Sequence, residues 1–371
     1  MSDRAALSET SGEFLTLHEF VKAAKIRLSA NIWDYLIGGA DTETTVKRNR
    51  QALDSLAFRP RVLRDVSTID CSGTLLGKSL RLPVLLAPVG SLESFEAGGA
   101  ATAGKAASAF GVPIMVSSVT QPGLEATAQA VPGPKIFQLY VRGDEAWTDD
   151  FVRRARDAGY DGFCFTVDTA VYSRRERDIA KRFAKPWRQR ATGQFFQAGL
   201  NWDHVKRFKD KHDLPLILKG IATAEDAELA CRHGVAAVYV SNHGGRQLDH
   251  GRGTLDILPE VVQAVGGRAE IIIDGGFSRG TDVLKAVALG ARAVAVGRLY
   301  CYGLAAAGAD GVYRVLELLE TEMATSLGLL GLTNLAGLDR SCLHPAAPVA
   351  APHVHSAFPL LNLADEGYGG R

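Results

Sequence analysis

The stretch "LPLILKGIATAEDAELACRHGVAAVYVSN", residues 214–242, contains the repeating unit of the fold. Its two apolar runs, "LPLIL" and "AAVYV", are rich in branched residues and do not alternate with polar ones, which is typical of parallel strands covered on both faces. The segment between them has helical spacing and ends at Gly234, where glycine adopts a left-handed helix cap at little cost. The stretch therefore predicts a strand, a helix and a second, parallel strand.

The same unit recurs along the chain. Six further apolar runs begin at Arg81, Val112, Lys135, Gly162, Glu270 and Ala291. With the two runs already quoted they predict eight successive βα units, and hence an α/β fold of the (β/α)₈ TIM barrel type. The alternative is a doubly wound open sheet. The count of eight favours the barrel, as does the lack of a GxGxxG motif after the first strand.

Three segments lie outside these units in the single domain that we expect over residues 1–371. Residues 1–75 are expected to form a helical prelude, in which "TLHEF" offers a capping box with Thr16 as N-cap and Glu19 three residues later. The fourth βα loop, residues 170–200, is long enough to be a mobile lid, and its basic and aromatic residues leave contact with an acidic membrane open. Residues 343–371 are expected to form an extended tail, with His353 and His355 on the surface.

Composition narrows the possible classes of protein. Hydrophobic residues make up 46% of the chain, enough for a large core, and 42 basic against 41 acidic residues give no electrostatic case for nucleic acid. The five cysteines are scattered and lack zinc-like spacing, so we expect reduced thiols, with Cys164 and Cys301 buried, and no metal site. No apolar run approaches the roughly 18 residues of a membrane span, and a cytoplasmic location is expected.

Polar residues follow the predicted strands at their carboxyl ends, where (β/α)₈ barrels carry their active sites. We therefore expect these residues to converge on one face of the barrel. In strand order they are Pro88, Val89 and Gly90; Ser117 and Ser118; Gln138 and Tyr140; Thr166 and Asp168; Lys219; Ser241, Asn242, His243 and Arg246; Asp274, Gly275 and Gly276; Gly297 and Arg298.

The last two units resemble a phosphate site. "DGGFSRG" and "GR" supply glycine amides that can approach an anion closely, and Arg298 can bind it with two hydrogen bonds.

Lys219 and His243 suit chemistry at the same face. Lys219 could form a Schiff base, as in an aldolase or lyase, remain cationic beside a developing anion, or only pair with Asp274 or Asp168. His243 could be a core histidine, but it is the best candidate for a base. Arg246 could clamp a substrate carboxylate nearby, and Asp168 could orient the imidazole. These groups predict proton abstraction from, or oxidation of, a small carboxylic acid, without naming the cofactor.

Several motifs together carry a resemblance: "SNHGGRQLDH", "DGGFSRGTDVLKAVALG", "FQLYV", "TVDT", "LILKG" and "VGR". The chain resembles the FMN-dependent 2-hydroxy acid oxidase and dehydrogenase family from "WDYLIGGA" to "LDRS", which is nearly its whole length. The resemblance implies FMN as cofactor and oxidation of an (S)-2-hydroxy acid to the 2-oxo acid. It implies O2 as acceptor, giving H2O2, or a quinone in a dehydrogenase, and a homo-oligomer, expected to be a tetramer.

The resemblance also implies roles for individual residues. His243 would take a proton from the substrate with support from Asp168, while Arg246 and Arg175 bind its carboxylate and Tyr35 and Tyr140 donate hydrogen bonds to it. Lys219 would lie near the pyrimidine edge of the flavin and stabilise its reduced anion. The other implied FMN contacts are Pro88, Val89, Gly90, Ser117, Gln138, Thr166 and Ser241 along the cofactor, Asp274 on its ribityl chain, and Gly275, Gly276, Ser278, Arg279, Gly297 and Arg298 at its phosphate.

Three positions depart from the family pattern. Val119 replaces a tryptophan of the glycolate-type members, which favours larger 2-hydroxy acids. Gly90 replaces an alanine of the oxidases, so a dehydrogenase remains an alternative, and Ser278 replaces a phosphate-side arginine. A flavin-binding barrel without catalytic activity is a further alternative.

Overall fold

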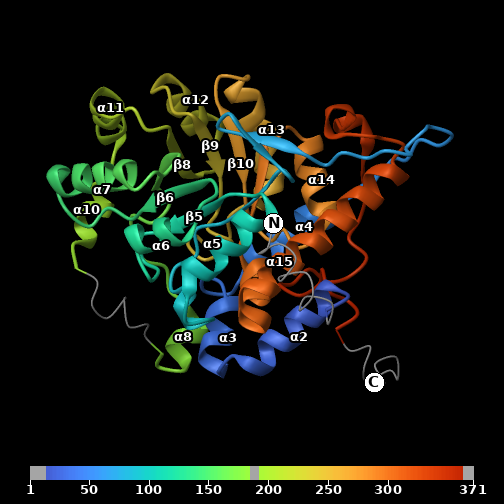
Figure 1. The fold of residues 1–371 in the computed structure, drawn as a ribbon, viewed down its shortest axis with the longest axis horizontal. Coiled ribbons are helices and arrows are strands. Elements are labelled where there is room, and N and C mark those ends of the chain that lie inside the picture. The colour runs from blue at the N-terminus through green and yellow to red at the C-terminus, as the bar shows by residue number, and fades with distance from the viewer. Residues whose placement is uncertain (1–13, 184–191, 362–371) are drawn as a thin grey trace.

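The computed structural model describes residues 14–183 and 192–361, and its centre is a closed barrel of eight parallel strands (Figure 1). Around the barrel the strand order is β10, β11, β4, β5, β6, β7, β8 and β9, so the prediction of a (β/α)₈ barrel is confirmed and the open sheet is wrong. All eight apolar runs form strands. They are β4 (Val84–Leu86), β5 (Ile114–Ser117), β6 (Lys135–Leu139), β7 (Gly162–Thr166), β8 (Leu216–Ile221), β9 (Ala237–Val240), β10 (Glu270–Ile273) and β11 (Ala293–Val296).

Side chains alternate between the two faces of each strand, as the strand period requires. In β6, Phe137 faces the surrounding helices, whereas Ile136 belongs to a separate apolar cluster that also contains Met115, Cys164 and Ile217 of neighbouring strands. The same cluster includes Leu75 and Leu80 of the hairpin formed by β2 (Gly73–Leu75) and β3 (Lys78–Leu80). Because the hairpin covers the amino-terminal end of the barrel, the inward residues at the carboxyl end are left to form a site.

Helices surround the barrel in the expected βα order. They are α5 (Gly99–Phe110), α6 (Leu124–Ala130), α7 (Glu145–Asp157), α11 (Trp202–Lys211), α12 (Ala224–Arg232), α13 (Thr254–Val265), α14 (Gly280–Ala288) and α15 (Arg298–Leu329). The last of these is broken at Ala307 and Gly308, where the backbone leaves helical geometry.

The amino-terminal segment is helical over part of its expected range. It forms α2 (Leu17–Arg27), α3 (Ala30–Ile37) and α4 (Thr44–Asp54), and the capping box of Thr16 and Glu19 is present. The prediction of a helical prelude over residues 1–75 is wrong beyond Asp54, because β1 (Leu56–Phe58) and β2 are strands. β1 pairs with β12 (Leu343–Pro345), a partner from the other end of the chain that local spacing could not reveal. Residues 1–13 lie outside the described part.

The fourth βα loop is partly helical. It carries α8 (Glu176–Ala180) and α10 (Gln194–Ala198). Residues 184–191 of this loop lie outside the described part, and its expected mobility stays a prediction. Figure 1 shows α2, α3 and α8 together on one side of the barrel. This arrangement brings the amino-terminal helices and the fourth loop to the same end of the molecule.

The last described residues of the carboxyl-terminal segment, 354–361, form packed turns, so the prediction of an extended tail is wrong there, whereas residues 343–345 are a strand. Phe358 is 1% exposed, and the His355 ring stacks on Trp33 of α3 at 5.5 Å. His353 is exposed as expected, whereas His355 is half-buried. Aromatic partners on α2, α3 and α15 hold this segment, and residues 362–371 lie outside the described part.

The five cysteines are free thiols, and Cys164 and Cys301 are buried as expected. Within residues 14–183 and 192–361, the helices are too short or too polar to cross a bilayer.

A buried ion pair joins α4 to α14. Arg50 Nη1 and Nη2 each donate to Asp282 at 2.8 Å, and both side chains are at most 5% exposed. Burial alone would raise the pKa of Asp282, but Arg50 outweighs it and holds the pKa below its ordinary value. The stabilisation is therefore present at neutral pH and is lost as the pH falls through this depressed pKa.

We expect Asp282→Asn to lower the free energy of unfolding by about 3 kcal/mol, because it leaves the buried Arg50 charge with Asp54 as its one carboxylate partner among the described residues. Urea unfolding at neutral pH measures the change. Asp157→Asn is the matched control, since Asp157 pairs with Arg153 where both are half exposed, and its expected cost is below about 0.5 kcal/mol. Equal costs for the two variants would contradict the assignment.

Candidate active site

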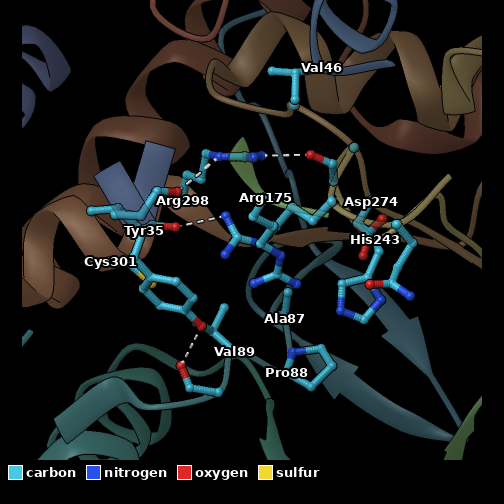
Figure 2. Close-up of a pocket in the computed structure, with 18 of the residues that line it drawn as sticks. Tyr35, Val46, Ala87, Pro88, Val89, Arg175, His243, Asp274, Arg298 and Cys301 are labelled. Atoms are coloured by element: carbon cyan, nitrogen blue, oxygen red, sulfur yellow. Dashed lines mark hydrogen bonds between the residues drawn. The ribbon is translucent and has the colours of Figure 1, made fainter. Parts of the chain in front are cut away.

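A pocket opens at the carboxyl end of the barrel, where polar residues replace the apolar inward rows. Two residues beyond the inward Ile136, Cys164 and Ile217 come Gln138, Thr166 and Lys219, which face inward by the same alternation. Figure 2 shows Tyr35, Arg175 and His243 directed toward one cavity. Other residues that line this pocket are Pro88, Val89, Gly90, Val119, Tyr140, Lys219, Arg246, Asp274, Gly275, Gly276, Ser278, Gly297 and Arg298.

His243 is held between an acid and a phenol. Its Nδ1 lies 3.0 Å from Asp168 Oδ1, and its Nε2 lies 3.2 Å from the Tyr140 hydroxyl. Because a carboxylate only accepts hydrogen bonds, Nδ1 carries a proton, and in the neutral imidazole Nε2 has the free lone pair. The nitrogen that can act as a base is therefore the one beside Tyr140.

The backbone around His243 is shaped for this position. His243 has φ of 59°, in the left-handed region, and its N–H donates to Ser241 Oγ at 3.0 Å. In the adjacent strand β8, Gly220 has φ of 116°, and a Cβ there would lie 2.7 Å from Asp168 Cβ. Only a residue without a side chain lets Asp168 approach this strand so closely.

Burial and charge set the protonation states of this pair. Burial lowers the pKa of His243 below its ordinary value, and Asp168 offsets only part of that effect. Burial alone would raise the pKa of Asp168, but the nearby His243 and Lys219 outweigh it and lower the pKa. At neutral pH the site therefore holds a neutral imidazole hydrogen-bonded to a carboxylate, which is a general base ready to accept a proton.

Lys219 lies in a second polar cluster at the barrel mouth. It is 3% exposed, its Nζ donates to Ser241 Oγ at 3.0 Å, and Asp274 Oδ2 lies 3.6 Å away. Asp274 in turn accepts hydrogen bonds from Ser241 and Tyr239. Burial alone would lower the pKa of Lys219, but Asp274 and Asp168 outweigh it and the pKa is raised. Lys219 is therefore a buried cation at neutral pH.

Glycines and a half-buried arginine, Arg298, follow the ends of β10 and β11. Gly275 and Gly276 have φ of 118° and 85°, conformations that favour glycine, and a Cβ on Gly275 would lie 2.2 Å from Thr254 Oγ1. Arg298 donates to the carbonyl oxygens of Leu36, Gly38 and Gly244.

Arg298 is a half-buried cation that lies near a second arginine, Arg246. Burial, followed by the nearby Arg246, lowers the pKa of Arg298 to about 10, and no carboxylate of the described residues forms an ion pair with it. A half-buried cation that forms no ion pair with a carboxylate of the described residues, in a pocket that glycines also line, suits an anion such as phosphate.

Two residues expected at the phosphate differ in their placement. Ser278 lines the pocket, and its Oγ donates to the Gly276 carbonyl at 3.1 Å. Arg279 does not line it, because its guanidinium pairs with Glu322 of α15 at 2.6 Å and donates to the Ala357 carbonyl. The structure thus places Arg279 outside the pocket, in contrast to the expected contact with the cofactor. Its neighbour in sequence faces the pocket, whereas Arg279 turns toward α15.

The turn between α3 and α4 organises three arginines. The Gly38 carbonyl accepts from both Arg246 and Arg298 at 2.8 Å, and the Arg246 guanidinium also lies 4.7 Å from the centre of the Tyr35 ring. Further along the turn, Glu43 accepts two hydrogen bonds from Arg177, two residues after Arg175. The Tyr35 hydroxyl donates to the Gly90 carbonyl at 3.2 Å. The amino-terminal helices thus fix the cationic side of the pocket.

Beneath the pocket, three predicted residues are fully enclosed. Gln138 is 0% exposed, and neither its amide oxygen nor its amide nitrogen has a hydrogen-bond partner among the described residues. The Thr166 hydroxyl is likewise without a partner, while the neighbouring Ser117 accepts from the Val119 N–H at 3.4 Å. Buried polar atoms without partners are costly, so these groups point to a polar ligand whose donors and acceptors reach them.

Some pocket residues carry no signal in the sequence. Asn49 exchanges hydrogen bonds with Asn242 and lies against Gly276, yet α4 is far from β9 in the chain. Phe95, Arg142, Tyr172, Phe183, Cys301, Tyr302, His353 and Val354 also line the pocket. They belong to loops and helices. The barrel rule predicts site residues only at the carboxyl ends of the strands, so it could not indicate them.

Comparisons with known proteins agree with this geometry. Residues 24–345 match the sequence family described as FMN-dependent dehydrogenase. Glycolate oxidase 1 of Oryza sativa is 39% identical over 359 residues, covering 91% of this chain and 97% of that protein. L-lactate oxidase of Nostoc sp. is 39% identical over 358 residues, covering 89% of this chain and 98% of that protein.

Solved structures give the same result. The crystal structure of mandelate oxidase with (S)-2-phenylpropionate is similar with a TM-score of 0.84 and 39% sequence identity. It covers 91% of this chain and 100% of that chain.

Proposed function

Because the chain belongs to the FMN-dependent dehydrogenase family of 2-hydroxy acid oxidases, we propose that it oxidises an (S)-2-hydroxy acid with an apolar side chain larger than that of glycolate. His243 is the base and O2 the electron acceptor in this proposal. The observation that carries it is the His243–Asp168 pair at 3.0 Å, whose free nitrogen lies beside Tyr140 in a pocket that also contains Arg246 and Arg175.

The residues present fit FMN. The partnerless amide of Gln138 and hydroxyl of Thr166 suit the polar edge of a flavin ring, and Lys219 is the cation nearest to them in the strand register. Gly275, Gly276 and Arg298 suit the phosphate, and Asp274 the ribityl chain. When bound, FMN takes up the two electrons of the oxidation and passes them to the acceptor.

The two arginines suit the substrate carboxylate. Arg246 is fixed by the carbonyls of Tyr35 and Gly38, and Arg175 lies in the fourth loop, anchored through Arg177 to Glu43. A bound carboxylate would be oriented by these cations so that the hydroxyl-bearing carbon faces His243. The proton that the substrate loses moves to His243 Nε2, and Asp168 stabilises the imidazolium that forms.

The state of Lys219 weighs against the aldolase or lyase alternative. A Schiff-base lysine must be neutral to attack a carbonyl, which requires a lowered pKa. Asp274 and Asp168 instead outweigh burial and raise the pKa of Lys219, so the amine stays protonated. This supports an electrostatic role for Lys219.

The apolar side of the pocket supports a substrate with a bulky side chain. Val119 and Gly90 lie against each other, since a Cβ on Gly90 would be 2.8 Å from Val119 Cγ2, and Phe95 lies on the same wall. Two small residues at this point leave room that a large ring at position 119 would fill. The solved relatives bind phenyl-bearing acids, which agrees with this size.

We expect Val119→Trp to lower kcat/KM for (S)-mandelate relative to glycolate by about 10- to 100-fold, because the indole would occupy the space of the phenyl ring. Steady-state assays with both acids give the ratio. Val62→Trp is the control, since Val62 is 79% exposed and lies outside the pocket. An unchanged ratio in Val119→Trp would show that residue 119 does not limit substrate size.

We expect a pH profile of kcat/KM with an acid limb centred below pH 6.5, because burial lowers the pKa of His243 from that ordinary value. Neutral His243 is the active form. Activity therefore persists below pH 6.5 and is lost as the pH falls through the lowered pKa. A plateau that begins only above pH 7 would contradict the lowered pKa.

Anaerobic mixing of the holoenzyme with a panel of (S)-2-hydroxy acids tests the whole proposal. Loss of the visible flavin absorbance is expected, followed by its return with H2O2 when O2 is admitted. If the flavin absorbance returned slowly in O2 but rapidly with a quinone, the dehydrogenase alternative would be favoured. Gly90, which replaces an alanine of the oxidases, is the residue that raises this alternative. No bleaching by any acid would favour a barrel that binds flavin without turnover.

A further inference from the structure

The chain continues past the end of its family match, and this continuation returns to the pocket. The match ends at residue 345, whereas residues 346–361 run beside α15 toward α2 (Figure 1). We call residues 351–361 the C-terminal strap. The strap lies outside the matched region, which contains all the strands of the barrel and the proposed catalytic residues.

Aromatic contacts fix the strap to three helices. Phe358 is 1% exposed, and its ring meets those of His18 in α2 and Tyr302 in α15 edge to face. His355 stacks on Trp33 of α3 at 5.5 Å. A turn is closed between these anchors and the pocket, because Ser356 Oγ donates to the His353 carbonyl at 2.8 Å. The strap is thus docked through buried rings.

Between its anchors the strap forms part of the pocket wall. His353 and Val354 line the pocket together with Arg298, Tyr302 and Val46. The neighbouring His355 lies close to the same cation. Burial, then His353 and Arg298, lower the pKa of His355 to about 4. Ser278 and the glycines that follow β10 and β11, which suit phosphate, line the same pocket.

His353 brings a hydrogen-bond donor to this wall. Its Nδ1 accepts from the His355 N–H at 3.1 Å. A backbone N–H can only donate, so Nδ1 of neutral His353 carries no proton and Nε2 does. Nε2–H is thus the donor that neutral His353 can offer, and in a pocket that also contains Arg298 a phosphate oxygen is a suitable acceptor.

We propose that the C-terminal strap completes the FMN site, with His353 donating a hydrogen bond to the cofactor phosphate and the docked rings holding the strap over this end of the pocket. FMN release then requires the strap to lift. The proposal depends on FMN binding alone and not on the substrate, so its test uses the oxidised holoenzyme without any 2-hydroxy acid.

The experiment dilutes holoenzyme variants and follows FMN release by the rise of flavin fluorescence. We expect Phe358→Ala to speed release at least about tenfold, because it removes the central anchor. His353→Ala should speed release about tenfold, the effect of losing one hydrogen bond to a charged group. His353→Gln, which keeps an N–H donor, should stay within about twofold of the wild type. Leu360→Ala is the control, since Leu360 is in the strap but 50% exposed.

The outcomes separate the two parts of the proposal. If Phe358→Ala does not fold, as judged by its melting temperature, His355→Ala tests the same docking through the stack on Trp33. Wild-type release rates in the folded anchor variant would overturn the strap as a closure. Release from His353→Gln as fast as from His353→Ala, or no change in either variant, would overturn the role of His353 as phosphate donor.

Discussion

His243→Asn is expected to lower kcat about a thousandfold while the enzyme still binds FMN. The substitution removes the imidazole, whose Nδ1 is held by Asp168 at 3.0 Å and whose Nε2, beside Tyr140, has the free lone pair. Asparagine is the suitable replacement because φ is 59° at this residue, and asparagine tolerates the left-handed region better than most residues. Stopped-flow bleaching of the flavin absorbance by substrate measures the loss.

His250→Asn supplies a matched control for this variant. His250 lies in the same loop, also has a left-handed φ, of 57°, and is exposed outside the pocket. The same replacement in the same backbone conformation should therefore leave kcat within about twofold of the wild type. If both variants lost activity equally, the effect would come from the loop and not from the base.

The sequence predicts the barrel well because its signal is local. Each strand is a short apolar run and each helix is periodic, so residues 214–242 already contain the whole unit and its repetition gives the count. The candidate site follows from the same rule, because the barrel places the residue after each strand at one mouth. Lys219, His243 and Asp274 are found in this way without any knowledge of their partners.

What the sequence could not predict depends on contacts between distant segments. Tyr35 reaches the pocket from a helix before the barrel, and only the resemblance pointed to it. Neither the barrel rule nor the resemblance indicated that Asn49 and His353 line the pocket. Arg279 was misplaced for the opposite reason: its glycine-rich motif indicates an anion site, but Glu322, more than forty residues later, draws the guanidinium away. Pairing across the fold decided these positions.

Asp168→Asn should lower kcat about a thousandfold although Asp168 does not touch the substrate. The carboxylate fixes the tautomer of His243 and stabilises its charged form. An asparagine amide can donate to Nδ1, which would move the imidazole proton to Nε2 and leave no lone pair for the substrate. Because Asp168 also opposes the lowering of the His243 pKa by burial, its loss should move the acid limb of kcat/KM to lower pH.

The double variant His243→Asn/Asp168→Asn distinguishes this role from an independent one. If Asp168 acts through His243, its removal costs little once the imidazole is gone, and the double variant should be within about threefold of His243→Asn alone. If the two losses multiplied to about a millionfold, Asp168 would have a separate task at the reacting atoms. The left-handed loop at His243 and the close approach of Asp168 to Gly220 both favour the first result, since together they hold the two side chains as one unit.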